Sequence, residues 1–129
     1  KHCVFLTEMV TEFKSNGIRT SIFVDPVESQ IEGAKTTGVD RIELYTESFA
    51  QQFPHSPKTA IAPFVACAKL ANNIGLGINA GHDLSLKNIA FFKSQIPGLL
   101  EVSIGHALIA ESIYSGIENV IASYLDKLR

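Results

Sequence analysis

The apolar positions of this chain follow two alternating patterns, one typical of helices and one typical of buried strands. Leu6, Met9, Val10 and Phe13 recur at helical spacing and predict a helix over residues 1–16. Short runs of apolar and β-branched residues then predict four strands along the chain. We expect these strands at residues 20–24, 41–45, 76–84 and 100–104.

A helical pattern follows each of the predicted strands. Asp25, Pro26 and Glu28 suit the cap, the first helical position and the capping-box acid of a helix that ends at Gly38. Residues 46–58 are polar and predict a long loop. The later helices are expected from Thr59 to Gly75, from the cap Ser85 to Pro97, from Ala107 to Tyr114, and from the capping-box pattern at Ser115–Glu118 to Leu128.

This alternation predicts the α/β class, with parallel strands covered by helices. Neither a GxGxxG nor a GxxxxGK[ST] pattern is present, which disfavours an open nucleotide-binding sheet. A complete (β/α)8 TIM barrel takes about 250 residues. Four strands in 129 residues are therefore close to half a barrel, with two strand edges unpaired. Either the chain is the C-terminal half of a longer one, or two copies assemble; the helical start at Lys1 favours the first.

Composition narrows the class of protein further. An apolar content of 46% is enough for one domain with a real core. A formal net charge of -2 disfavours partners that need a cationic face, such as nucleic acids or membrane surfaces. No apolar run approaches the ~20 residues that span a bilayer. Cys3 and Cys67 lie in helical patterns, which predicts reduced, half-buried thiols in a cytoplasmic protein.

Two of the strands end in the same pair of residues, Gly81-His82 and Gly105-His106. Ligands of both parallel architectures bind at the C-terminal ends of the strands. Imidazole titrates near neutral pH, so His82 suits general acid–base work. The alternative is a solvated loop histidine that caps the next helix. His106 precedes a short helix whose free amides suit a phosphate, and its role would be phosphate binding or proton transfer.

Glu43 lies between apolar neighbours in the second predicted strand. A buried carboxylate of this kind has a catalytic or electrostatic role, or it pairs with a lysine or arginine inside the barrel. His82, His106 and Glu43 are suitable zinc ligands by type, but their spacing matches no zinc pattern. His55, between two prolines, is expected to be solvated.

Four stretches together resemble a known family. In chain order they resemble the second half of pyridoxine 5′-phosphate synthase, of the deoxyxylulose-dependent route to vitamin B6. The resemblance covers essentially the whole chain, and its Asn-Ala-Gly-His and Ile-Gly-His-Ala motifs are specific. The stretches are Gly17–Asp25, Arg41–Thr46, Asn79–His82 and Ile104–Ala107.

The resemblance implies a (β/α)8 barrel of which residues 1–129 are the C-terminal half, with the N-terminal half absent. The last four βα units would then follow a preceding helix, and an extra short helix would follow the last strand. It also implies an octamer, and a condensation of 1-deoxy-D-xylulose 5-phosphate with 3-amino-2-oxopropyl phosphate. The products are pyridoxine 5′-phosphate, phosphate and water, and no metal or organic cofactor is used.

The resemblance assigns roles to five positions of this sequence. His82 matches the proton donor, and Glu43 matches the carboxylate that stabilises the transition state. Gly105 and His106 match positions that bind the aminoketone phosphate. Asp83 also matches a substrate-binding position, where the family usually has glycine. A carboxylate repels a phosphate, so either the backbone of Asp83 alone makes that contact or its side chain points away.

Two other functions fit parts of the pattern. Another phosphate-binding barrel enzyme, an aldolase or isomerase, would share the phosphate end, but no predicted strand carries the internal lysine of a Schiff-base aldolase. A non-catalytic half-barrel that only binds a phosphorylated metabolite is the second alternative. The synthase family has further base and arginine residues in its first half, so we expect these 129 residues to be inactive by themselves.

Overall fold

The computed structural model describes residues 2–129 and contains one sheet of four parallel strands. The strands lie side by side in chain order, β1-β2-β3-β4, and all their pairings are parallel. Three of them agree with the predicted bounds to within one residue at each end, whereas β3 ends three residues earlier than predicted. They are β1 Ser21–Val24, β2 Arg41–Tyr45, β3 Gly77–Gly81 and β4 Leu99–Ser103.

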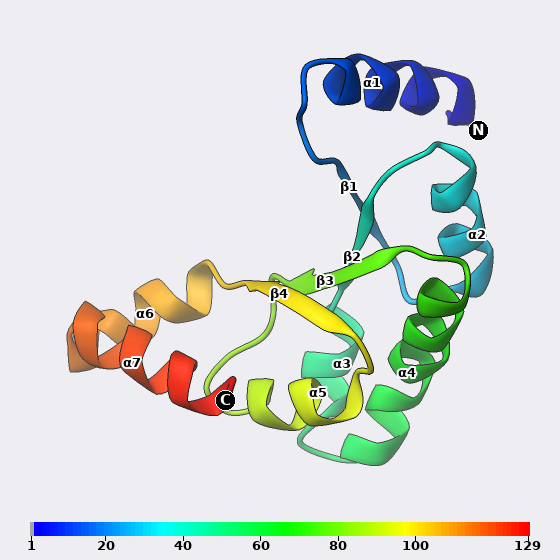
Figure 1. Ribbon diagram of the computed structural model, residues 1–129. Coiled ribbons are helices and arrows are strands. Elements are labelled where there is room, and N and C mark those ends of the chain that lie inside the picture. Colours follow the sequence, from blue (N-terminus) through cyan, green and yellow to red (C-terminus); the bar gives the residue numbers. More distant parts are fainter. Residues whose placement is uncertain (1) are drawn as a thin grey trace.

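Helices connect the strands and cover one face of the sheet (Figure 1). Helices α2, α3, α4 and α5 lie on that side, whereas α1 lies beyond β1, and α6 and α7 lie beyond β4 (Figure 1). The bounds are α1 Cys3–Ser15, α2 Glu28–Thr36, α3 Glu47–Gln52, α4 Pro57–Asn73, α5 Ile89–Gln95, α6 His106–Ser115 and α7 Ile117–Lys127.

The strand order decides between the two parallel architectures. A doubly wound sheet reverses its strand order at a switch point, whereas the strands of a (β/α)8 barrel follow one another around the barrel. Here every neighbouring pair of strands is consecutive in the chain. The fold is therefore a partial (β/α)8 barrel with four of the strands, and β1 and β4 are the outer strands of the described sheet.

The helix-covered face of the sheet holds the hydrophobic core. Ile42 and Leu44 of β2 and Ile78 and Ala80 of β3 are fully buried there, because alternate residues of a strand point to the same face. Three phenylalanines from the covering helices pack edge to face above them, with ring centroids 5.0–5.9 Å apart. These are Phe49, Phe64 and Phe92.

One of these phenylalanines lies in a helix that the sequence did not predict. Residues 46–58 were expected to be a loop, but residues 47–52 form α3, and α4 begins at Pro57. Phe49 is fully buried, so tertiary packing stabilises this short helix despite its polar neighbours.

The predicted caps of two helices are wrong. Helix α2 begins at Glu28, with Val27 and not Asp25 before it, because Asp25 forms two hydrogen bonds with the side chain of Gln30. Ser85 does not cap α5, which begins four residues later. The backbone N–H of Ser85 donates to Oδ1 of Asn88 at 2.9 Å, in a turn that precedes α5.

The capping box expected at residues 115–118 is also absent. Ser115 is the last residue of α6, and Gly116 joins α6 to α7 with a φ of 79°.

The two cysteines were expected to be half-buried, and neither is. Cys67 is buried in α4, Cys3 is exposed, and both are free thiols. None of the helices in residues 2–129 combines the length and apolar character needed to cross a bilayer.

Candidate active site

The face of the sheet away from the core helices carries polar and charged side chains. Register places Phe23, Glu43, Asn79 and Glu101 at one level on the four strands. Near the C-terminal ends of the strands this face opens into a cavity of about 380 Å³. Its walls come from β1, β2, β4 and the turn after β3, formed by Phe23, Glu43, His82, Ser103, Ile104 and Gly105.

Glu43 contributes a half-buried carboxylate to this cavity. Burial raises its pKa above the ordinary value near 4.5, and the negative charge of Glu101 acts in the same direction. His82 and a hydrogen bond with Ser103 oppose this shift. A positive charge in the cavity would stabilise the charged form of Glu43 and lower the pKa of its carboxyl group again.

His82 follows β3 directly and has an unusual backbone conformation. Its φ is 71°, in the left-handed region that residues other than glycine rarely adopt. Its backbone N–H donates to the carbonyl oxygen of Ser103 in β4 at 3.0 Å. Its exposed ring lies between two aromatic rings, with centroid distances of 5.8 Å to Tyr45 and 5.9 Å to His106.

Gly105 and His106 form the N-terminus of α6, a helix of ten residues. Gly105 is the N-cap residue, and no described heavy atom lies within 4 Å of the position that its Cβ would occupy. The first backbone amides of a helix lack intrahelical acceptors and favour an anion. The ring of His106 meets that of His82 nearly at right angles, at 81°.

Asp83 is not among the residues that line this cavity. Its backbone N–H faces two acceptors, the carbonyl of Gly81 at 3.1 Å and the hydroxyl of Thr46 at 3.2 Å. Its carboxylate oxygen Oδ2 is buried and has no hydrogen-bond partner within residues 2–129. The structure thus brings Glu43, His82, Gly105 and His106 together, with Asp83 to one side.

A charged cluster lies next to the cavity on the same face, towards the N-terminal ends of the strands. Arg41 donates to Oε2 of Glu101 and, at 3.1 Å, to Oδ1 of Asn79, while Arg19 pairs with Glu101 at 3.0 Å. An ion pair was one expectation for Glu43, but in the structure Glu101 makes such a pair, with both Arg41 and Arg19. No signal in the sequence distinguished these two glutamates, because the choice depends on strand register.

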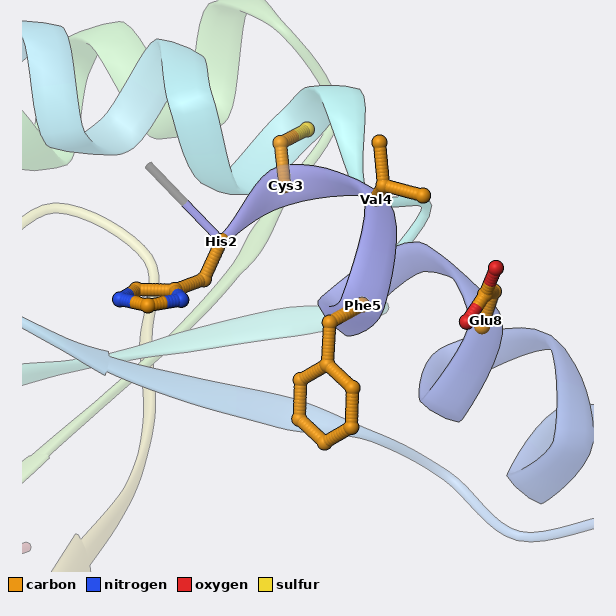
Figure 2. A pocket seen from close by; sticks show the side chains of 5 residues that line it. All are labelled: His2, Cys3, Val4, Phe5 and Glu8. Carbon is orange, nitrogen blue, oxygen red and sulfur yellow. The ribbon is translucent and has the colours of Figure 1, made fainter.

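A second hollow lies at the start of α1. It is lined by residues of the first turns of one helix, and Figure 2 shows them: His2, Cys3, Val4, Phe5 and Glu8. Its lining comes from the start of one helix alone, whereas the cavity of Glu43 and His82 takes its lining from three strands and a turn. Across residues 2–129, histidine, cysteine and acidic side chains form no group of three or more that could hold a metal ion.

Comparison with known proteins identifies the family. The family described as "Pyridoxal phosphate biosynthesis protein PdxJ" matches the chain over residues 1–129. The chain belongs to the PdxJ family. Among PdxJ relatives, a protein of Flavobacterium johnsoniae named pyridoxine 5′-phosphate synthase is 64% identical over 129 residues. Proteins of the same name are 61% identical over 129 residues in Christiangramia forsetii and 58% identical over 120 residues in Parabacteroides distasonis.

The match covers the relatives only in part. All of this chain aligns with the first two relatives and 93% of it with the third, but these alignments cover 54%, 54% and 50% of the relatives. The chain spans about half the length of the curated relatives it matches. Membership of the PdxJ family confirms the resemblance drawn from the sequence, and the partial barrel agrees with it.

Sequence reasoning missed three contributors to the site of this PdxJ chain. Ser103 and Phe23 line the cavity, and Thr46 contacts the backbone on both sides of His82. Strand alternation could have placed Phe23 and Ser103 on the same face as Glu43. The contact of Thr46 depends on the path of the chain after β3, which no local pattern reveals.

Proposed function

We propose that this chain forms part of a pyridoxine 5′-phosphate synthase. The reaction would condense 1-deoxy-D-xylulose 5-phosphate with 3-amino-2-oxopropyl phosphate to pyridoxine 5′-phosphate, phosphate and water. One observation carries the proposal: in a PdxJ-family chain, Glu43 and His82 line one cavity with Gly105, at the C-terminal ends of the strands.

His82 would act as the proton donor. Imine formation, dehydration and ring closure all require protons to move at neutral pH, which suits an imidazole. Its ring is exposed beside the cavity and is flanked by Tyr45 and His106. A ring in this place can reach a substrate that enters from the open side of the sheet.

Glu43 would stabilise the cationic iminium stages of the condensation. Its pKa is raised because burial and Glu101 penalise the charged carboxylate. A positive charge that develops in the cavity would offset this penalty, so the interaction is strongest with the cationic intermediate.

Gly105 and His106 would bind the phosphate of the aminoketone substrate at the N-terminus of α6. The amides of the first turn are directed away from the helix body, and the space around Gly105 lets a phosphate approach the backbone. The backbone N–H of Asp83 already has two acceptors, so a contact of this N–H with substrate would require a change in that turn.

We also propose that residues 1–129 are the C-terminal half of one (β/α)8 barrel, with the relatives' unmatched part supplying the other strands. The support is that β1 and β4 have no outer neighbour in the part of the chain that the structure describes, together with the 54% coverage of the first two relatives. The proposed octamer rests on the family resemblance.

The test uses a completed chain, made by joining this chain to the part of the Flavobacterium johnsoniae relative that it does not match. We expect the completed chain to form pyridoxine 5′-phosphate. His82→Asn should lower kcat by about 10²-fold or more, because it removes a proton donor. His55→Asn changes an exposed histidine outside the site and is the matched control.

Product formation can be followed by the absorbance and mass of pyridoxine 5′-phosphate. Equal loss of rate in the two histidine variants would contradict the role of His82. Unchanged rate in His82→Asn would contradict it as well.

A further inference from the structure

Thr46 is a fully buried polar residue immediately after β2. Its hydroxyl makes two hydrogen bonds, both with the backbone of the turn after β3. It donates to the carbonyl oxygen of Gly81 and accepts from the backbone N–H of Asp83, the latter at 3.2 Å. A single side chain therefore binds the residues on both sides of His82.

The backbone of His82 needs such support. A φ of 71° in a residue with a side chain is strained and persists only where the surroundings impose it. The N–H of His82 donates to the carbonyl of Ser103 on the neighbouring strand, which fixes one side of the turn. Thr46, just after β2, fixes the other side of the turn, because β2 is the neighbour of β3 on the side away from β4.

The direction of the His82 ring depends on this conformation. With a φ in the ordinary negative region, the Cα–Cβ bond of residue 82 would leave the backbone in a different direction. The present conformation puts the ring at the cavity of Glu43, with the His106 ring 5.9 Å away. The strain is thus located at a residue whose side chain must face the cavity.

We propose that Thr46 is a positioning residue, whose hydroxyl fixes the left-handed backbone of His82 and so directs the imidazole into the active site. This inference rests on the proposed role of His82 as proton donor. Thr46 itself does not line the cavity and is not a catalytic residue.

A purely structural role for Thr46 can be separated from this one by comparison with Thr37. Thr37 is also a buried threonine, but its hydroxyl donates to the carbonyl of Ala34 at the end of α2, at 2.7 Å. Thr46→Val and Thr37→Val each remove one buried hydroxyl and keep the shape of the side chain. Thr46→Ser keeps the hydroxyl and removes a methyl group.

The first measurement is steady-state kinetics of these variants in the completed chain. We expect Thr46→Val to lower kcat by about tenfold or more with KM little changed, because a displaced proton donor slows the chemistry and leaves phosphate binding intact. Thr46→Ser should recover most of kcat, and Thr37→Val should keep kcat. Similar kcat values in Thr46→Val and the parent, or similar losses in both valine variants, would overturn the proposal.

The second measurement does not depend on activity. The three-bond HN–Hα coupling of residue 82 in the completed chain reports its φ, and its signal is assigned by comparison with His82→Asn. We expect this coupling to change in Thr46→Val and to stay the same in Thr46→Ser and Thr37→Val. An unchanged coupling in Thr46→Val overturns the positioning role. Absence of product in the parent, with the expected change in coupling, would contradict the synthase function and leave the conformational role supported.

Discussion

At the scale of single residues, the site depends on Gly81, which has no side chain. A Cβ on Gly81 would clash with the carbonyl oxygen of Ser103 and lie 3.0 Å from Oε1 of Glu43. The first of these neighbours is backbone and cannot rotate away. The end of β3 therefore approaches β4 and Glu43 as closely as it does because residue 81 is a glycine.

Gly81→Ala should consequently destabilise the protein and disturb the site together. We expect a loss of about 1–3 kcal/mol in the free energy of unfolding, as for other overpacked positions, with a lower kcat in the completed chain. Urea unfolding checks the first effect.

Gly33→Ala, in α2, is the matched control because no described heavy atom beyond its own stretch of helix lies within 4 Å of its Cβ position. Alanine at an open helix position should stabilise by up to about 1 kcal/mol. Equal stability of the two alanine variants would contradict the close approach at Gly81.

The residues of the site could be predicted from the sequence to different extents. Glu43, His82 and His106 were identifiable because a reactive side chain in or just after a parallel strand lies near the binding edge. Thr46 was not, because a threonine after a strand is typical of any turn. Its function arises from contact with residues that lie 35 and 37 positions further along the chain.

At the scale of elements, Asp40 joins three segments at the N-terminal end of the sheet. It accepts hydrogen bonds from Lys14 of α1 at 2.8 Å and from the backbone N–H of Thr20, just before β1, at 2.9 Å. Asp40 itself immediately precedes β2. These bonds, that with Lys14 first, lower the pKa of Asp40 from 3.8 to about 2.

Asp40→Asn should therefore cost stability in a pH-dependent way. The pKa of Asp40 is lower in the folded protein, so its contribution is complete above about pH 3.8 and is lost as the pH falls towards 2. We expect a loss of about 1 kcal/mol or less at pH 7, since the pair is partly exposed. The unfolding free energies of variant and parent should converge near pH 2.

Asp126→Asn provides the control for this effect. Asp126 pairs with Arg129 on the exposed surface of the last helix and its end, three residues apart. Removal of that pair should change the free energy of unfolding little at any pH. A constant difference between Asp40→Asn and the parent from pH 7 to pH 2 would contradict the low pKa of Asp40.

The elements were predicted well where local pattern decides them and poorly where side chains compete. The four strands and the longer helices have clear periodicity, and all of them are present. The helix starts at residues 25, 85 and 115 were not predicted correctly. At the first start, the side chain of Asp25 accepts a hydrogen bond from Gln30 and does not cap the helix. At the second, the side chain of Asn88 accepts from the backbone N–H of Ser85 in a turn before the helix. At the third, Ser115 completes α6, and Gly116 separates it from α7.

At the scale of the whole molecule, the sequence predicted a parallel sheet that stops short of a complete barrel. The consecutive strand order agrees with this, and β1 and β4 have no neighbour on their outer sides within the described residues. Apolar side chains of α6 and α7 are exposed as well, including Ile113 at 77% and Tyr114 at 90% exposure, and exposed apolar surface of this kind often marks a contact with another part of a protein.

We propose that these 129 residues form only part of the active site. The cavity has walls from β1, β2, β4 and the turn after β3, and its remaining side is open. Our central claim is that the open side is closed by the part of the PdxJ relatives that this chain does not match.

Pyridoxine 5′-phosphate formation by this chain alone and by the completed chain, at equal concentration, is the most direct measurement. We expect turnover by the completed chain and none by residues 1–129 alone, because substrate would be exposed to water on the open side and lack the other half of its contacts. Robust turnover by residues 1–129 alone, or none by the completed chain, would contradict the claim.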